Sequence, residues 1–322
     1  MYKRIAVAVV YAVAAFATSA NTALAQVYPN KPIKIIVPFG PGGSTDITAR
    51  VFGKFLEDQW KQPVVVENRA GANGIIGTEA LKNSAPDGYT LALASNSTHA
   101  AAPYLFKKLP YDPIKDFEHV GLFGVFGSVA LVPANSPFKS IPELASYAKA
   151  NPGKVFFGYF NTSSQVPGEL LKVSAGLPIE SVPYKTITNA VPDLISGQIQ
   201  FMFMDYVAAS SHIASGKLIP IAITEAKRLE RWPNVPAVAE FYPGYEIQAF
   251  LSLSAPAGTP KPILAKINLA MREAQANPAF KQQLESLGLR LRAMSPDEYQ
   301  AFLLNELERW GRYIKAAKIE AQ

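Results

Sequence analysis

Residues 33–46 read IKIIVPFGPGGSTD, a stretch that predicts a strand, a glycine-rich turn and the start of a helix. Ile33–Val37 is typical of a buried strand, and apolar residues recur at helical spacing from Ile47 onward. Gly42 and Gly43 allow the backbone to approach a ligand closely, and the unpaired amides of a helix start attract anions. The turn is therefore a candidate anion site, and a plain strand–helix connection is the alternative.

The turn does not match either of two familiar nucleotide-binding motifs. It is not a Walker loop, because no lysine precedes Ser44, and it is not a dinucleotide fingerprint, because Thr45 stands where the third glycine belongs. Asp46 in the first helical turn stabilises the helix start but repels a highly charged anion such as a triphosphate. A nucleotide is therefore not the expected ligand.

Similar apolar runs alternate with helical patterns along the chain, which predicts an α/β fold. Ligands of open parallel sheets lie beyond the carboxyl ends of the strands, so the segments that follow four expected strands form the candidate site. Three of these segments are rich in small residues, hydroxyls and amides, and none carries a lysine or an arginine. The candidate ligand-binding residues are Phe39, Gly42, Gly43, Ser44, Thr45, Ser95, Asn96, Asn161, Thr162, Ser163, Ser164 and Asp205.

Helix boundaries are marked by capping patterns. Ser140 followed by Glu143 predicts a helix that begins at Ile141, and Ser196-Gly197 predicts a helix end. A strand is expected over 198–204. The C-terminal fifth is expected to be helical, and Ser295 begins a second capping box with an apolar stripe behind it.

Asp205 and the histidines are the ionisable groups that matter most for function. Asp205 follows the strand over 198–204, where it either binds a ligand ammonium or acts as a base, or accepts backbone N–H bonds and fixes a loop. His99 lies in a candidate segment as polar lining, whereas His119 and His212 are expected to be ordinary surface histidines or histidines with satisfied hydrogen bonds. The sequence contains neither Gly-x-Ser-x-Gly nor His-Glu-x-x-His, so we expect no catalytic residue, no metal site and no cofactor.

Composition excludes several other classes of protein. The chain has 322 residues, 49% of them hydrophobic and 17% charged, which suits about two folded domains rather than a disordered chain. It has no cysteine, which rules out disulfides, thiolate metal sites and a cysteine nucleophile. Lysine and arginine are scattered rather than clustered, so nucleic acid is not an expected partner.

Residues 1–25 have the anatomy of a secretory signal peptide. Lys3 and Arg4 precede an apolar run over Ile5–Phe16, and Ala23-Leu24-Ala25 is a small-x-small cleavage signal. The apolar run is shorter than the ~20 residues that a membrane span needs. We therefore expect cleavage after Ala25 and a secreted mature protein.

From Tyr28 to Gln322 the sequence resembles the Bug (TctC-like) solute-binding proteins of tripartite tricarboxylate transporters. The resemblance rests on motifs in a specific order, and it covers nearly the whole mature chain. They are YPxKPI from Tyr28, VPFGPGGSTD from Val37, VENRxGAxG from Val66, APDGYT from Ala85, VPYK from Val182, APAGTP from Ala255 and IKAA from Ile314.

The resemblance implies a periplasmic, two-lobed Venus flytrap of type II, with a hinge of two crossovers near residues 125 and 245. Lobe 1 is expected to hold 26–125 and 246–322, and lobe 2 to hold 126–245. Such a protein closes on a small carboxylated metabolite and delivers it to membrane subunits. It holds the carboxylate between the first glycine-rich loop and the hydroxyl-rich loop of the other lobe, through backbone groups and ordered water.

The function expected from this resemblance is non-enzymatic binding of a small organic acid, a dicarboxylate or an aromatic acid being favoured, by a monomer. An acidic amino acid as the ligand is the alternative, and a secreted hydrolase or lyase is a further one. One segment departs from the family pattern of Gly-x-Gly-Ser followed by His: Phe160 and Thr162 replace the glycines, and Gln165 replaces the histidine. Phe160 either packs in the hinge or core, or faces the cleft and favours an aromatic or longer aliphatic chain.

Overall fold

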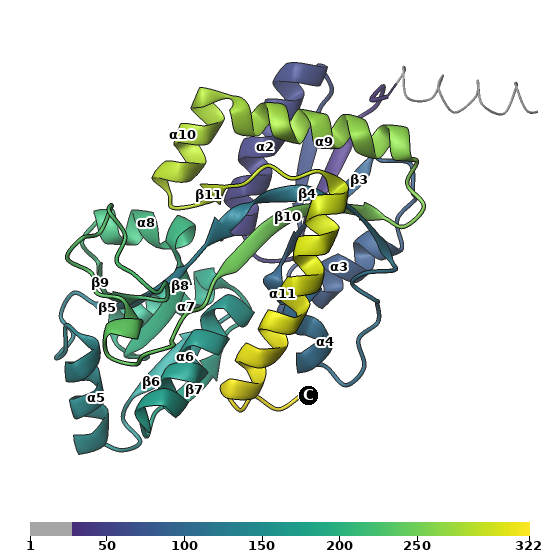
Figure 1. Ribbon diagram of the computed structural model, residues 1–322. Helices are drawn as coiled ribbons and strands as arrows, with labels where there is room; N and C mark the ends of the chain where they lie inside the picture. Colours follow the sequence, from purple (N-terminus) through teal and green to yellow (C-terminus); the bar gives the residue numbers. More distant parts are fainter. Residues whose placement is uncertain (1–27) are drawn as a thin grey trace, which may run out of the picture.

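The computed structural model describes residues 28–322, so the predicted signal peptide, residues 1–25, lies outside the described residues. Two lobes, each built on a β-sheet with helices packed around it, make up the molecule (Figure 1). The predicted α/β fold with two lobes is therefore confirmed. Within residues 28–322, no helix is long and apolar enough to cross a membrane.

The first sheet has six strands in the order β11-β4-β10-β3-β1-β2. β1 pairs in parallel with both β2 and β3, whereas β10 runs antiparallel to both β3 and β4. The carboxyl ends of β1 and β3 therefore lie side by side at one edge of this sheet. The strands are β1 (Ile33–Val37), β2 (Val64–Asn68), β3 (Thr90–Ser95), β4 (Phe117–Phe126), β10 (Ala249–Pro256) and β11 (Arg290–Leu291).

The second sheet has five strands in the order β7-β6-β8-β5-β9. β6 is parallel to β7 and β8, and β5 is antiparallel to β8 and β9. In each sheet one strand that follows a change of lobe, β5 or β10, is thus inserted antiparallel among its neighbours. The strands are β5 (Ser128–Pro133), β6 (Phe156–Tyr159), β7 (Glu180–Pro183), β8 (Phe201–Asp205) and β9 (Leu218–Ile223).

Helices cover both sheets. Those of the first lobe are α2 (Ser44–Trp60), α3 (Ile75–Lys82), α4 (Ala102–Leu105), α9 (Lys261–Ala276), α10 (Pro278–Ser286) and α11 (Pro296–Ala316). Those of the second lobe are α5 (Ile141–Ala150), α6 (Thr162–Ala175), α7 (Ile187–Ser196) and α8 (Tyr206–Ala214). Short helical turns occur at Ala72–Gly74, Asn96–Ala101 and Val238–Glu240.

The capping patterns predicted helix boundaries well. Ser140 caps α5 at the amide of Glu143, and α7 ends at Ser196 before Gly197, whose φ of 82° suits glycine. The predicted strand over 198–204 begins three residues late, at Phe201. The amide of Gln198 still donates to the carbonyl of Asp193 in α7 (2.8 Å), so the chain is completing the helix end there.

The apolar stripe of α11 packs against the first lobe, as expected for an amphipathic helix. Tyr299, Leu303, Trp310 and Ile314 are buried, and the Tyr299 hydroxyl donates to Ser252 in β10 (2.6 Å). Burial of each large side chain contributes about 2 kcal/mol. α11 also continues past the first sheet and contacts α6 of the second lobe (Figure 1).

The chain passes between the two sheets at β4–β5 and again between β9 and β10. Only Gly127 separates β4 from β5, and a Cβ there would lie 2.5 Å from the Tyr206 hydroxyl, so a larger residue would have to displace that buried ring. Thr224 links the two crossings: its hydroxyl accepts from the amide of Ser128 (2.8 Å) and donates to the carbonyl of Ile247 (2.9 Å). The lobe boundaries proposed from the sequence stay a prediction.

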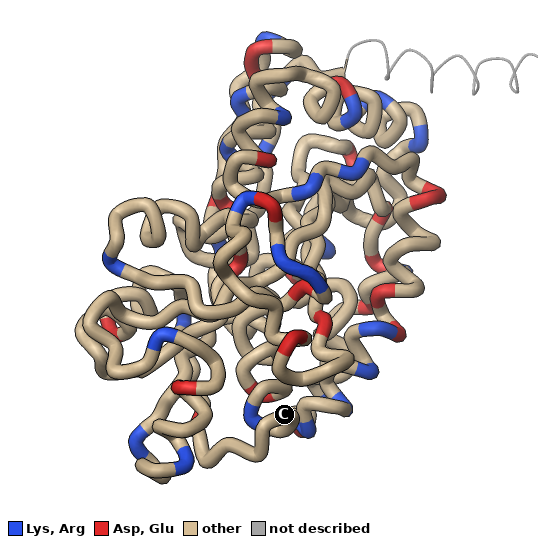
Figure 2. The backbone as a smooth tube through the Cα atoms, turned by 60° about the vertical axis from the view of Figure 1, so that its left-hand side comes forward, with Lys and Arg blue, Asp and Glu red and all other residues tan. Residues whose placement is uncertain are grey.

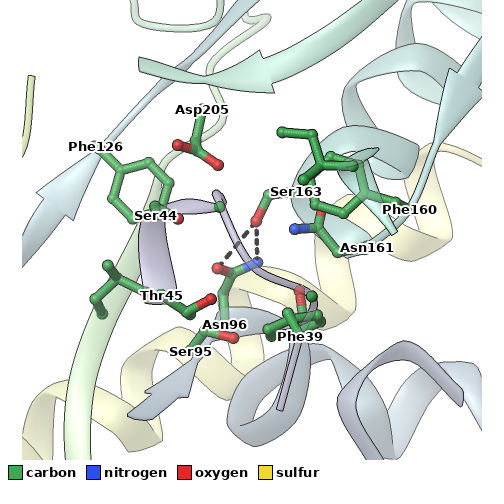
Figure 3. Close-up of a pocket in the computed structure, with 15 residues that line it drawn as sticks. Phe39, Ser44, Thr45, Ser95, Asn96, Phe126, Phe160, Asn161, Ser163 and Asp205 are labelled. Carbon is green, nitrogen blue, oxygen red and sulfur yellow. Dashed lines mark hydrogen bonds between the residues drawn. The ribbon is translucent and has the colours of Figure 1, made fainter. Parts of the chain in front are cut away.

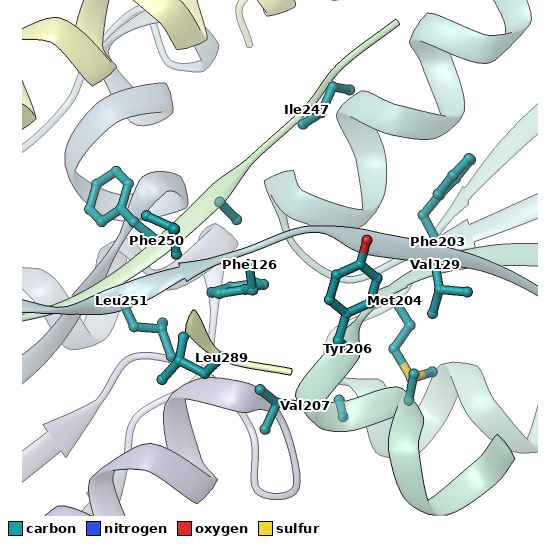
Figure 4. Close-up of a cluster of buried hydrophobic side chains, with 14 of the residues drawn as sticks. Phe126, Val129, Phe203, Met204, Tyr206, Val207, Ile247, Phe250, Leu251 and Leu289 are labelled. Atoms are coloured by element: carbon teal, nitrogen blue, oxygen red, sulfur yellow. The ribbon is translucent and has the colours of Figure 1, made fainter. Parts of the chain in front are cut away.

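Apolar packing surrounds these crossings. Phe126, Phe250 and Leu251 of the first sheet lie on one side of the Tyr206 ring, and Val129 and Met204 of the second sheet lie on the other, within one buried cluster (Figure 4). The positions of basic and acidic residues are spread along the backbone of the described chain rather than gathered in one stripe (Figure 2). Charge therefore does not mark one face of the described chain as a binding surface.

Candidate ligand-binding pocket between the lobes

A pocket lies between the lobes, where loops at the ends of β1, β3, β6 and β8 converge (Figure 3). Nine predicted residues line it: Phe39, Gly43, Ser44, Thr45, Ser95, Asn96, Asn161, Ser163 and Asp205. Its cavity volume is about 10 Å³, room for about one water molecule. The lobes are therefore closed in this structure, and a metabolite enters only when they move apart.

The N-terminus of α2 forms the first wall. Its N-cap residue, Gly43, has no side chain to cap the helix, and no described residue accepts a hydrogen bond from the amides of Ser44 and Thr45. A Cβ at Gly43 would meet nothing within 4 Å, so the backbone there borders open space. The uncapped amides and the helix dipole suit one anionic group.

Asp46 fixes the shape of this turn. Its carboxylate accepts hydrogen bonds from the Gly42 amide (3.0 Å), from Asn68 (2.9 Å) and from Arg50 (3.1 Å). Burial alone would raise the pKa of the Asp46 carboxyl, but the bonds from Arg50, Gly42 and Asn68 outweigh burial and lower it. Gly42, with φ of 86°, therefore serves the turn itself and does not line the pocket.

The loop after β3 forms the floor of the pocket. Ser95 and Asn96 are buried, and the Ser95 hydroxyl has no hydrogen-bond partner within the described residues. A buried hydroxyl without a partner is costly, because its lost hydration is not replaced. Ser95 therefore has a donor and an acceptor available for a ligand.

Two hydrogen-bonded bridges join the lobes around this floor. The carboxamide of Asn96 exchanges bonds of 3.0 and 3.1 Å with the Ser163 hydroxyl (Figure 3). Asn73, which was not among the candidate residues, donates to the Thr162 hydroxyl (2.7 Å). Thr162 thus lies in a bridge between the lobes rather than in the pocket lining.

The start of α6 forms the wall in the second lobe. The Asn161 side chain accepts from the Ser164 amide (3.0 Å), and the Ser164 hydroxyl in turn accepts from the Phe160 amide (3.1 Å). The hydrogen bonds of Ser164 are used within this capping box, and Ser164 does not line the pocket. Phe160, whose place the sequence left open, is 8% exposed and lines the pocket.

Asp205 ends β8 and caps α8 by accepting from the Ala208 amide (2.8 Å). Burial raises its pKa to about 6, and the Ala208 amide and the Ser44 hydroxyl oppose that rise. Asp205 therefore combines both roles that the sequence left open, since it fixes a helix start and lines the pocket. No lysine, arginine or histidine is among the described residues that line the pocket.

The pocket also contains residues that the strand-end rule missed, among them Phe126 and Leu251 near the crossings and Ile187 at the start of α7. Gly40 is another: a Cβ there would lie 2.7 Å from Thr186 of the other lobe, so glycine allows closure. In the sequence, the only indication of these residues was that apolar residues flank the strand ends.

His99 does not line the pocket, contrary to expectation. Its ring is buried, and the ring centroid lies 4.9 Å from that of Phe117. One ring nitrogen shares a hydrogen bond with the Thr98 hydroxyl (2.9 Å). Burial, assisted by His119, lowers the pKa of His99 well below its usual value. Among the described residues no group of three His, Asp or Glu side chains is placed to hold a metal.

Two mixed α/β lobes, joined by two crossings and closed over a small polar pocket, define a solute-binding protein of the Venus flytrap class. The family model described as the tripartite tricarboxylate transporter family receptor, TctC, matches residues 48–319. The chain therefore belongs to the TctC family, which confirms the resemblance identified from its motifs.

Individual relatives are similar to this chain over nearly their full length. Protein BugT of Bordetella pertussis is 36% identical over 295 residues, which cover 90% of this chain and 90% of BugT. The structure of R. palustris Rpa4515 with adipate matches with a TM-score of 0.88 at 28% identity, over 92% of this chain and 100% of that one. The structure of the periplasmic binding protein BugD matches with a TM-score of 0.87 at 31% identity, over 92% and 100%.

Proposed function

We propose that this chain is the periplasmic receptor that captures a small organic acid between its lobes and delivers it to the membrane subunits of a tripartite tricarboxylate transporter. It acts by binding and release, without catalysis. Membership of the TctC family and the likeness to Rpa4515, solved with adipate, support this function.

The observation that carries the proposal is the uncapped N-terminus of α2. The amides of Ser44 and Thr45 have no partner among the described residues, and Gly43 keeps the approach to them open. Together with the unpartnered Ser95 hydroxyl, they offer donors to one carboxylate. Backbone amides hold an anion without a counter-ion, which agrees with a pocket whose described lining lacks cationic side chains.

Gly43→Val tests the carboxylate position. Gly43 has φ of −82° and ψ of 169°, which any residue adopts, so valine fits the backbone and fills the approach to the amides. A thermal-shift screen of mono-, di- and tricarboxylates, aromatic acids and acidic amino acids first identifies a ligand. Calorimetric titration of that ligand into Gly43→Val is expected to show at least about a 100-fold loss, or about 2.7 kcal/mol.

Ser44→Ala is the matched milder variant, since it keeps the amide and removes one hydroxyl at a cost of about 1 kcal/mol. Unchanged circular dichroism and thermal midpoint confirm that both variants fold. Wild-type affinity in folded Gly43→Val would show that the carboxylate binds elsewhere. Recovery of the ligand chemically unchanged after incubation checks that the protein binds without catalysis.

An acidic amino acid is the second candidate ligand, because Asp205 lines the pocket and a carboxylate there suits an ammonium group. Asp205→Asn separates the two: it weakens glutamate and aspartate strongly if they are ligands, and leaves or improves the binding of a plain carboxylate.

A further inference from the structure

A second cavity, here called the tail cavity, adjoins the pocket described above and has a volume of about 360 Å³. It lies between the lobes, bounded by the Ala72-Asn73 turn, the end of α4, the loop after β6 and residues 319–322. Phe160 and Asn161 line both the tail cavity and the first pocket. The two spaces are therefore neighbours that share one wall.

Four aromatic side chains form part of the walls of the tail cavity, and the rest are aliphatic residues and polar ones such as Asn73 and Gln165. Phe106 comes from the first lobe, and Tyr159, Phe160 and Tyr184 come from the second. The hydroxyl of Tyr184 donates its proton to Asp193 (2.8 Å), so it has none to donate to a ligand carboxylate. Such walls, lined by aromatic carbon, favour an apolar group.

The charges around the tail cavity point the same way. Glu320 is the only charged side chain among the described residues that line it, and the first pocket has only Asp205. A second carboxylate on the ligand would face Glu320 and would meet no cationic partner in the described lining. Repulsion by Glu320, together with partial loss of hydration against the aromatic walls, therefore favours an uncharged group over a carboxylate there.

The tail cavity is large enough for such a group. An apolar cavity of about 150 Å³ holds a benzene molecule, and this one has more than twice that volume. The first pocket, by contrast, has a volume of about 10 Å³ in the closed lobes. Most of a ligand longer than its carboxylate therefore has to occupy the tail cavity.

We propose that the tail cavity is a subsite for an uncharged aromatic or aliphatic tail, so that the physiological ligand is a monocarboxylate with an apolar body. Phe160 separates this subsite from the carboxylate. This inference rests on the proposed function, since it presumes that a carboxylate is bound at the start of α2. The substrate class differs from the adipate bound by Rpa4515, whose two ends are both charged.

The test compares hexanoate with adipate, which have the same six-carbon chain and differ in the terminal carboxylate. Calorimetric titration at pH 7.5 is expected to show hexanoate binding at least about ten times more tightly. Octanoate and 3-phenylpropanoate are expected to bind more tightly than butanoate, because they bury more apolar surface.

Variants assign the effect to the tail cavity. Gln165 is half-buried on the cavity wall, and Gln165→Trp fills the space with an indole ring. It is expected to weaken hexanoate and 3-phenylpropanoate at least about tenfold, and butanoate less, because a shorter chain occupies less of the cavity. Phe106→Ala is the second variant, and Phe241→Ala, an exposed phenylalanine that lines neither cavity, is its matched control.

The outcomes separate this inference from the proposed function. Equal or tighter binding of adipate, with no effect of Gln165→Trp or Phe106→Ala, overturns the tail subsite while Gly43→Val still abolishes binding. Binding of these acids that Gly43→Val leaves intact overturns the carboxylate position itself. Hexanoate binding that is tighter than adipate binding, is weakened by Gln165→Trp and is unchanged by Phe241→Ala supports both the tail subsite and the carboxylate position.

Discussion

Replacement of Asp205 by asparagine tests the electrostatics of the pocket most directly. Asp205 is 3% exposed, and its carboxyl caps α8 while lining a pocket whose described walls carry no cationic side chain. The asparagine side chain has nearly the same shape and keeps an oxygen that accepts from the Ala208 amide. The substitution therefore removes the buried negative charge with little change in packing.

The size of the effect follows from the pKa. Burial raises the pKa of Asp205 from 3.8 to about 6, a shift of roughly two units. At about 1.36 kcal/mol per unit this corresponds to about 3 kcal/mol. Because the folded-state pKa lies above the unfolded one, this stabilisation is fully present below about pH 3.8 and is lost as the pH rises through 6. At pH 7.5 the wild-type protein therefore lacks the stabilisation that the protonated Asp205 carboxyl contributes at pH 4.

Asparagine carries no charge and escapes this loss. It caps α8 less strongly than a carboxylate, at a cost of about 1 kcal/mol. We expect Asp205→Asn to be about 2 kcal/mol more stable than the wild type at pH 7.5, and slightly less stable at pH 4.

The assay is urea unfolding of both proteins at intervals between pH 4 and pH 8. Asp58→Asn is the control, because Asp58 lies on the surface in an ion pair with Lys54 (2.8 Å). A stability difference between Asp205→Asn and wild type that stays constant over this range would refute the reasoning, since the buried carboxyl would then not change its proton affinity on folding.

Two further outcomes depend on close contacts. Asn73→Gly keeps the positive φ of 53° and removes the 2.7 Å bond to Thr162, so the ligand-free protein is expected to populate open lobes about fivefold more; small-angle scattering with the same radius of gyration as wild type would contradict this. Gly168→Ala is expected to destabilise the protein by about 2 kcal/mol in urea unfolding, because its Cβ would lie 2.2 Å from the Phe157 ring; unchanged stability would show that α6 moves away freely.

Local patterns predicted the correct elements where neighbours in sequence determine them. β1, the turn and α2 follow from residues 33–60 alone. The caps of α5 and α11 likewise follow from the few residues around Ser140 and Ser295. β4 and β10, two long strands of the first sheet, were not predicted. β4 contains Gly121 and Gly124, which weaken a strand pattern. A Cβ at Gly124 would lie 2.2 Å from the Arg290 carbonyl oxygen, so that glycine serves a partner far away in the sequence.

The site shows the same division. Ser95, Asn96 and Asp205 were found because each lies at the end of a strand, and parallel strands bring their carboxyl ends together. Asn73 was missed, because it lies in a turn where four consecutive residues, Gly71–Gly74, have positive φ, and only the position of the other lobe gives its side chain a partner. The place of Phe160 likewise depends on contacts across the lobes that no local pattern specifies.

The absence of a cation from the described lining has a consequence for selectivity. An arginine–carboxylate pair would hold every organic acid strongly and would slow its release at the membrane. At the carboxylate site proposed above, amides and hydroxyls at the start of α2 would recognise a carboxylate without constraining the rest of the ligand, and the negative charge of Asp205 would oppose the anion. The carboxylate contact therefore contributes little discrimination between acids.

If the tail cavity is the subsite proposed above, the choice among acids is made where Phe106, Phe160 and Tyr184 meet the body of the ligand. Substitutions in the tail cavity then change which acid is bound, and substitutions at Gly43 change whether any acid is bound.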